Sequence, residues 1–186
     1  MPSQTLTVVQ HSKTSSRRGV GKGSDLSGEF LEFFYPIHYK LGMALEDALR
    51  SGQLTRKQVA ILWLIRSEGE NGRRMRRKDI EQLITTWFEV SSSAITKALR
   101  AMARPPLNLL QVIEDPRSGR EKQVILTPKG EQFLLTMVGQ GQKFLRGIVE
   151  RLTLEENRNG IHFLRQATLA LDSIRAESTV NVVKSR

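Results

Sequence analysis

The segment from Ser91 to Pro128 constrains the fold more than any other part of the 186-residue chain. Ser91 can cap a helix, because a serine hydroxyl accepts hydrogen bonds from the free amides of a first helical turn. Ile95, Leu99 and Met102 follow at spacings of four and three residues, which places them on one helical face. We therefore predict an amphipathic helix that begins at Ser91 and packs this apolar face against a core.

The opposite face of this helix is polar, with small hydroxyl side chains first and cations after them. Its members are Ser91, Ser92, Ser93, Thr96, Lys97 and Arg100. Such a face can enter a DNA major groove, where small polar groups reach base edges and cations reach guanine or phosphate. The alternative stays open, since a solvated polar face is the ordinary state of a surface helix.

Two short apolar or β-branched runs come next, Leu109 to Glu114 and Gln123 to Leu126, separated by a basic turn. They predict a β-hairpin. Its tip would present Arg117, Arg120 and Lys122. Thr127 and Pro128 then begin another helix, because a capping hydroxyl before a proline suits a helix start. The order of helix, basic hairpin and helix is that of a winged helix-turn-helix.

From about Leu54 to Asp172 the chain resembles the MarR family of winged-helix transcriptional regulators. The resemblance rests on the Asp115-x-Arg117-x-x-Arg120 wing, on the Leu126-Thr127-Pro128-Lys129-Gly130 join, and on the long apolar helix after it. The turn between Ile80 and Ser91 is longer than is usual in the family, and residues 103–108 replace a short glycine-containing link. The resemblance implies a homodimer that binds a pseudo-palindromic operator in double-stranded DNA, and many members respond to a small aromatic effector.

The charge distribution also favours a polyanionic partner. The net charge is +10, and residues 50–130 carry 16 Lys and Arg against 8 Asp and Glu, so most of the excess lies in the predicted DNA-binding segment. Five cations occur within six residues there: Arg73, Arg74, Arg76, Arg77 and Lys78. The resemblance makes the next helix, predicted from Asp79 to Thr85, the first of the helix-turn-helix, and implies phosphate contacts at its start. A solvated charge run that only promotes solubility is the alternative.

The predicted fold is mainly α with a small β-hairpin wing, divided into five parts. These are a flexible basic arm (1–28), an N-terminal dimerisation helix (29–53) in which Pro36 favours a kink, the winged helix-turn-helix (54–130), C-terminal dimerisation helices (131–176) and a frayed tail (177–186). Capping boxes at Thr55 and Thr153 begin two of the helices. We expect Trp87 and Phe88 to fill the core. The dimer-interface residues predicted are Phe30, Phe33, Phe34, Ile37, Leu164 and Leu171; an intrachain core is nearly as compatible with the first-helix aromatics.

Several classes of function find no support in the sequence. The chain has no cysteine, which excludes disulfides and thiol redox sensing. It has no apolar run long enough for a membrane span and no signal-peptide pattern at its start, so we expect a cytoplasmic protein without a membrane partner. Its three histidines show no metal-ligand spacing, and we expect neither a metal, a cofactor nor enzymatic activity. The rival to a sequence-specific regulator is a structural or partner-docking winged helix that binds nucleic acid without sequence preference.

Overall fold

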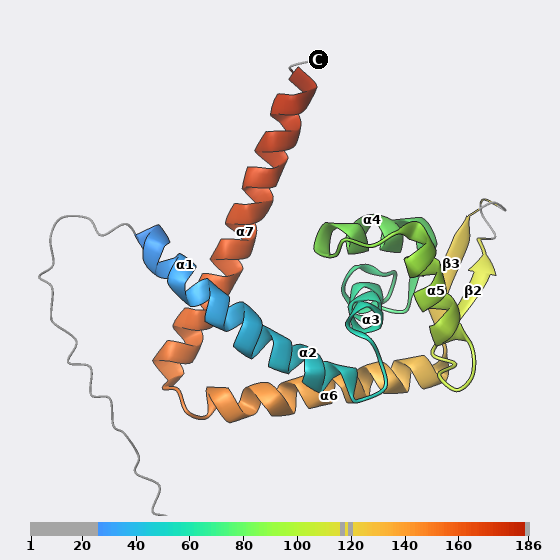
Figure 1. Cartoon of the computed structure of the whole chain (residues 1–186), viewed down its shortest axis with the longest axis horizontal. Helices are drawn as coiled ribbons and strands as arrows, with labels where there is room; N and C mark the ends of the chain where they lie inside the picture. The colour runs from blue at the N-terminus through green and yellow to red at the C-terminus, as the bar shows by residue number, and fades with distance from the viewer. Residues whose placement is uncertain (1–25, 116–117, 119–120, 185–186) are drawn as a thin grey trace, which may run out of the picture.

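The computed structural model describes residues 26–115, 118 and 121–184 (Figure 1). The predicted arm therefore lies outside the described residues, except for its last three positions. So do the predicted wing contacts Arg117 and Arg120.

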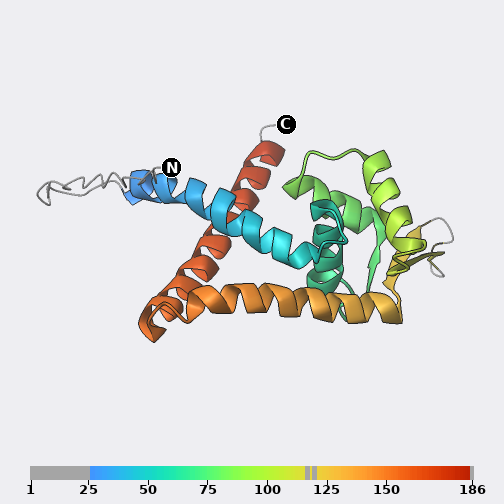
Figure 2. The same cartoon turned by 60° about the horizontal axis from the view of Figure 1, so that its bottom comes forward.

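The chain forms a winged-helix lobe and a helical scaffold. The lobe consists of α3 (Arg56–Glu68), β1 (Arg74–Arg76), α4 (Arg77–Trp87), α5 (Ser92–Ala103), β2 (Leu110–Glu114) and β3 (Lys122–Leu126). The scaffold consists of α1 (Leu26–Pro36), the π-helical turn η1 (Ile37–Gly42), α2 (Met43–Arg50), α6 (Pro128–Val149) and α7 (Leu154–Lys184). Helix α6 runs beneath the lobe and α2, and α7 leaves its far end and crosses α1 (Figures 1 and 2).

The helix starts follow the predicted capping residues. The Ser91 hydroxyl accepts from the Ala94 amide at 3.3 Å, and the Thr127 hydroxyl accepts from the Gly130 amide at 2.9 Å with Pro128 at the first helical position. Thr55 and Gln58 form both bonds of a capping box. These local hydrogen bonds satisfy amides that have no partner inside the helix, so they fix where each helix begins.

The hairpin is confirmed, and a third strand joins it. β2 pairs with β3 antiparallel, with Val112 opposite Val124. The short strand β1 pairs with the other edge of β3, giving the order β1-β3-β2. The sequence did not predict β1, because Arg74-Met75-Arg76 contains no β-branched or aromatic residue and forms its ladder only against a strand distant in sequence.

The core of the lobe is built from α3, α4, α5 and the sheet. Ile95, Leu99 and Met102 are all buried, which confirms the predicted inward face of α5. They join Leu62, Ile65 and other apolar side chains of one cluster that also receives Leu134 and Met137 from α6. Burial of one face therefore sets which side of α5 remains outside.

The join between hairpin and α6 requires a close backbone approach. A Cβ atom at Gly130 would overlap the Leu109 carbonyl oxygen. Thr127 holds the same strand, because its amide donates to that carbonyl at 3.0 Å and its hydroxyl donates to the Asn108 carbonyl at 2.7 Å. Gly141 packs against α2 less tightly, since a Cβ there would lie 2.7 Å from Leu49 Cδ2, the end of a side chain that can move.

Several predicted boundaries differ from the structure. α4 extends from Arg77 to Trp87, two residues beyond the predicted Asp79–Thr85 helix at each end. Trp87 is 50% exposed and does not fill the core, whereas Phe88 is partly buried and packs against the core. The N-terminal helix begins at Leu26 and changes to a π-helical turn directly after Pro36. α7 continues to Lys184, through most of the stretch expected to fray.

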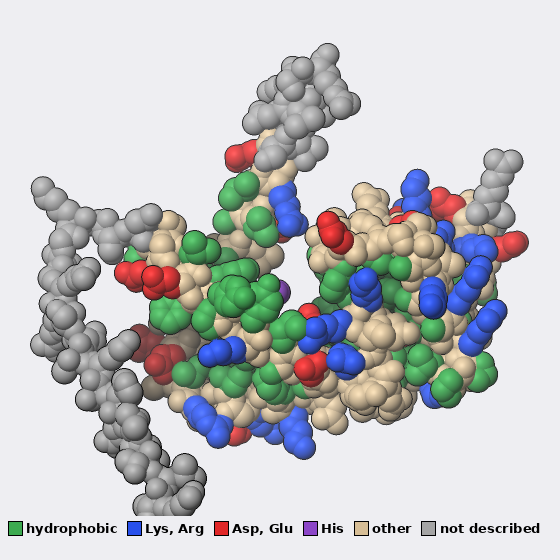
Figure 3. Space-filling view, in the orientation of Figure 1, with side chains coloured by type: hydrophobic (Ala, Val, Ile, Leu, Met, Phe, Trp, Pro, Cys, Tyr) green, Lys and Arg blue, Asp and Glu red, His purple; other side chains and the backbone are tan. Residues whose placement is uncertain are grey.

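The scaffold leaves a broad apolar surface uncovered within the single chain. The predicted interface residues Phe30, Phe33, Phe34 and Ile37 on the first helix, and Leu164 and Leu171 on α7, are all exposed. Phe30 stacks on Phe163 with ring centroids 5.0 Å apart, which brings α1 and α7 together. Figure 3 shows the hydrophobic side chains gathered over this end of the molecule, away from the lobe. An intrachain core at these positions is therefore excluded.

Candidate nucleic-acid interface

The outer face of α5 and of the residue after it is a stripe of exposed side chains, most of them cationic, which we call the α5 stripe. It consists of Ser93, Lys97, Arg100, Ala101 and Arg104, all exposed. Because these residues are spaced by three, four or one, they lie along one side of the helix opposite the buried Ile95 and Leu99. A shallow hollow of about 660 Å³ follows the stripe.

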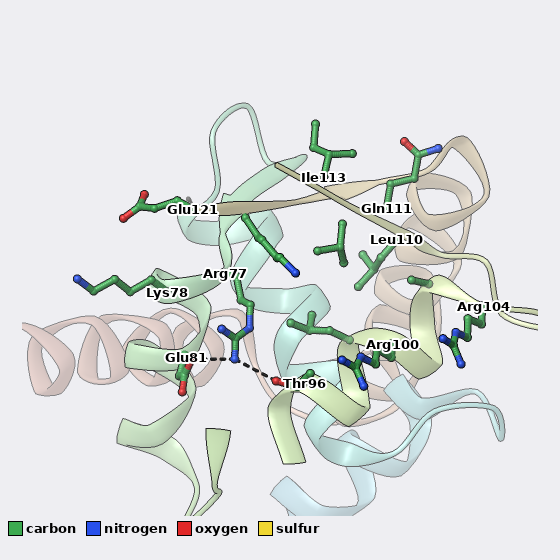
Figure 4. A pocket seen from close by; sticks show the side chains of 14 residues that line it. Arg77, Lys78, Glu81, Thr96, Arg100, Arg104, Leu110, Gln111, Ile113 and Glu121 are labelled. Atoms are coloured by element: carbon green, nitrogen blue, oxygen red, sulfur yellow. Dashed lines mark hydrogen bonds and ion pairs between the residues drawn. The ribbon is translucent and has the colours of Figure 1, made fainter. Parts of the chain in front are cut away.

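A groove separates α5 from the wing (Figure 4). Its volume is about 1070 Å³, and its walls come from α4, from the second half of α5 and from β2. Among its lining residues, Lys78, Arg100, Arg104 and Lys122 have no carboxylate partner within the part of the chain that the structure describes. Apolar side chains such as Leu99 and Ile113 form part of its surface. Cations without partners along a concave surface can receive phosphate oxygens.

Residues 73–78, which we call the basic run, contain four arginines, and each of them has a carboxylate partner. Arg73 pairs with Glu131 at 3.1 Å, and Arg74 pairs with Glu70 at 2.7 Å. Hydrogen bonds to the Asp79 carboxylate, at 2.7 and 3.0 Å, raise the pKa of Arg76 above its ordinary value.

The last arginine of the run, Arg77, pairs with Glu81 at 3.2 Å. Four cations face four carboxylates, so the run contributes less positive potential than its sequence suggests. The phosphate contacts predicted for these arginines stay a prediction.

Arg77 also reaches across to α5. Its Nη2 donates to the Thr96 hydroxyl at 3.0 Å and to the Ser92 hydroxyl at 3.2 Å. The Thr96 hydroxyl donates in turn to the Ser92 carbonyl at 2.9 Å. Figure 4 shows the Arg77 side chain between Glu81 and Thr96. The predicted reading residues are thus divided. The Ser92 and Thr96 hydroxyls bond to Arg77, whereas Ser93, Lys97 and Arg100 are exposed, with the Ser93 hydroxyl 2.9 Å from that of Ser91.

The base of the wing is held by its own hydrogen bonds. Asp115 is only 5% exposed, its amide donates to the Glu121 carbonyl at 2.7 Å, and its carbonyl accepts from the Ser118 amide at 3.1 Å. A carboxylate enclosed in this way is shielded from an approaching phosphate. Lys122 lies at the start of β3 on the exposed side.

A second cavity lies between the lobe and the scaffold. Its volume is about 890 Å³ and its lining is mainly apolar, from α2, α3 and α6 together with Trp87 and Phe88. Trp63 lies in its wall with the Arg66 guanidinium 5.2 Å from the ring centroid. Trp63 and Trp87 are the only two tryptophans of the chain.

Some site residues were not predicted from the sequence. Arg104 continues the α5 stripe four residues after Arg100, and extending the helical spacing past the first ten residues would have identified it. Glu81, which pairs with Arg77, follows it at the i, i+4 spacing and was readable from the same principle. The bonds from Arg77 to α5 join residues 15 and 19 positions apart, and no local pattern predicts them.

Within the described ranges, no cluster of three or more His, Cys, Asp or Glu side chains is arranged to hold a metal ion. None of the helices searched has the length and apolar character needed to cross a membrane.

Comparison with known proteins gives one family match. Residues 54–130 match the model of the winged helix DNA-binding domain family. These bounds coincide with the predicted helix-turn-helix and wing. None of the curated proteins compared with the chain is similar enough to count as a relative.

Solved structures share the fold over most of the chain. A MarR-family protein from Bacillus stearothermophilus superposes with a TM-score of 0.67 at 17% identity, covering 82% of this chain and 99% of that one. Wild-type MarR from E. coli superposes with a TM-score of 0.59 at 18% identity, covering 73% of this chain and 93% of that one. MepR, a transcription regulator of the Staphylococcus aureus multidrug efflux pump MepA, superposes with a TM-score of 0.58 at 19% identity. The match covers 77% of this chain and 97% of that one. The predicted resemblance is confirmed, and at these identities it concerns the fold.

Proposed function

The chain has the winged-helix fold of MarR-family transcriptional regulators, and from this premise we propose that it is a sequence-specific DNA-binding regulator that acts as a homodimer. One observation carries the proposal. The helix whose inner face is locked into the core presents Ser93, Lys97, Arg100 and Arg104 outward. Beside it lies a groove in which four of the lining cations, Lys78, Arg100, Arg104 and Lys122, have no carboxylate partner among the described residues.

The stripe suits a DNA major groove for reasons of size and chemistry. A single helix fits that groove, where Lys and Arg side chains bond guanine and a serine hydroxyl bonds several base edges. The protein groove between α5 and the wing would then lie along one strand of the DNA backbone, with Lys78 and Lys122 close to the phosphates of that strand. Because β2 and β3 form the far wall, the wing would approach the adjacent minor groove.

The exposed apolar surface supports the homodimer. Aromatic and aliphatic side chains on α1, η1 and α7 are too many for one monomeric surface to leave in water. A two-fold contact through them would place two copies of α5 on one side of DNA. Two reading helices of such a dimer enter successive major grooves about 34–36 Å apart.

Selection of bound duplexes from a random pool tests this function. We expect enrichment of a two-fold symmetric motif whose half-sites are centred about one helical turn apart. The selected duplex should bind about 10³-fold or more tightly than a scrambled one at fixed salt. Binding without enrichment would instead support a winged helix that holds nucleic acid without sequence preference.

The second cavity supports control by a small aromatic ligand. It lies where the lobe meets α2 and α6, so an occupant would contact both parts of the molecule. Because both tryptophans line it, intrinsic fluorescence reports on binding there directly.

Titration with benzoate and with phenol as probes should therefore change the tryptophan emission, and the change should saturate as the probe concentration rises. Ala60→Leu, which places extra atoms in the cavity wall, should remove that response. An unsaturable change that persists in Ala60→Leu would exclude this cavity as the site.

A further inference from the structure

Arg77 begins α4 and is bonded to the first two turns of α5. Its guanidinium reaches the Ser92 and Thr96 hydroxyls at 3.2 and 3.0 Å and the Glu81 carboxylate at 3.2 Å. We call these four residues the Arg77 cluster. The side chains of Arg77 and Glu81 are 31% and 29% exposed, so the pair is partly shielded from water and from salt.

The cluster uses the geometry of arginine. All three contacts are made by one atom, Arg77 Nη2, whose direction is fixed by the rigid guanidinium plane. A lysine ammonium is a point charge on a flexible stem and does not fix direction in the same way. The contacts therefore set both the distance and the rotation of α5 relative to α4.

The cluster also changes what Thr96 can do. A threonine hydroxyl has one proton to donate, and Thr96 donates it to the Ser92 carbonyl. The same oxygen accepts from Arg77. It has no proton left for an acceptor on a base edge, so Thr96 is poorly suited to the direct reading that its position in the sequence suggests.

We propose that Arg77 is a positioning residue for sequence recognition, and that it holds α5 so that Ser93, Lys97, Arg100 and Arg104 face the bases and phosphates. The proposal rests on the proposed DNA binding. It assigns Arg77 to orientation of the reading helix, whereas Lys78, the next residue and exposed without a carboxylate partner among the described residues, is assigned to the phosphate backbone.

The first test needs no DNA. In Arg77→Gln, amide hydrogen exchange in the first two turns of α5 should accelerate on the order of tenfold, as expected when hydrogen bonds to a charged group are lost. Arg77→Lys should give a similar acceleration, because an ammonium keeps the charge but loses the rigid plane that fixes the direction of Nη2. Thr96→Val keeps the shape, removes the hydroxyl and should accelerate the same amides. Unchanged exchange in all three folded variants would overturn the positioning role.

The second test separates orientation from phosphate contact. Arg77→Gln should lower the ratio of affinities for the selected and scrambled duplexes at least about tenfold, while the slope of log K against log salt changes little. Lys78→Gln is the matched control, and it should change the salt slope but leave the affinity ratio as it is. Its slope should fall in magnitude by about 1 for each protomer bound, with the ratio unchanged.

The outcomes distinguish this inference from the proposed function. If Arg77→Gln lowers the salt slope as Lys78→Gln does and leaves the ratio unchanged, Arg77 is a phosphate ligand and the inference is wrong. If the wild-type chain enriches no motif, the proposed function itself fails, and hydrogen exchange then still decides whether Arg77 holds α5. Should Arg77→Gln fail to fold, Thr96→Val supplies both readouts.

Discussion

At the scale of single residues, the absence of a side chain at Gly130 determines how closely the wing and α6 approach. The Leu109 carbonyl lies where a Cβ atom of residue 130 would stand, and the three nearest atoms all belong to the backbone of Leu109, which cannot rotate away. Gly130→Ala should therefore destabilise the lobe by about 1–3 kcal/mol, as overpacking in a closed site does.

Gly139 is the matched control for this prediction. It lies on the same helix, is exposed, and has no atom within 4 Å of its Cβ position. Gly139→Ala should stabilise the protein by up to about 1 kcal/mol, because alanine has the higher helix propensity. Urea unfolding of both variants at one protein concentration measures the two changes. Equal effects of the same sign would show that the close approach at Gly130 is not needed.

At the scale of elements, the start of α7 depends on an ionised glutamate. The Glu156 carboxylate accepts from the Thr153 amide at 2.7 Å and from its hydroxyl at 2.8 Å. These bonds favour the charged form and lower the pKa of Glu156 below its ordinary value of 4.5. The capping stabilisation is consequently present above the ordinary pKa and is lost as pH falls through the lowered one.

We therefore expect the amide proton shift of Thr153 to titrate with a midpoint below 4.5. Glu156→Gln keeps an acceptor but cannot titrate, so it should flatten this curve. Glu155→Gln removes the same charge from the neighbouring position and should leave the curve in place. A midpoint at or above the ordinary value would contradict the capping role.

The elements also show how far sequence reasoning reaches. The caps at Ser91 and Thr127 and the buried face of α5 were predicted correctly, because each depends on residues within a few positions of one another. The hairpin was predicted correctly because its two strands are joined by a short turn that has its own sequence signal. Strand β1 and the bonds from Arg77 to α5 were not, since their partners lie 15 or more positions away. The ion pairs of the basic run show the same limit. The sequence shows the positive charge of Arg73, but it does not show that Glu131 on α6 pairs with it.

At the scale of the whole molecule, the uncovered apolar end predicts self-association. Phe33 and Phe34 are 66% and 64% exposed on α1. Replacing both with aspartate should place charges in the proposed interface and leave a monomer or an unfolded chain. Sedimentation velocity distinguishes these outcomes when it is combined with circular dichroism.

Ile113→Asp provides the control, because Ile113 is 40% exposed on the wing and lies far from α1 in the fold. That variant should sediment as the wild type does. A folded dimer from the doubly substituted chain would place the subunit contact elsewhere.

We expect the α5 stripe, rather than the paired arginines of residues 73–77, to carry DNA binding. Two charge-matched variants test it on the selected duplex across a salt series. One replaces Lys97, Arg100 and Arg104 with glutamine, and the other replaces Arg73, Arg74 and Arg76. Both lose three positive charges, so a difference between them cannot come from net charge.

The stripe variant should lose specific binding, and its salt slope should fall in magnitude by about 1 for each phosphate contact removed in each protomer. The run variant should retain a preference for the selected duplex and most of its salt slope, because its arginines already face Glu131, Glu70 and Asp79. The opposite result, with binding kept by a folded stripe variant and lost by a folded run variant, would contradict the claim and move the interface to the basic run.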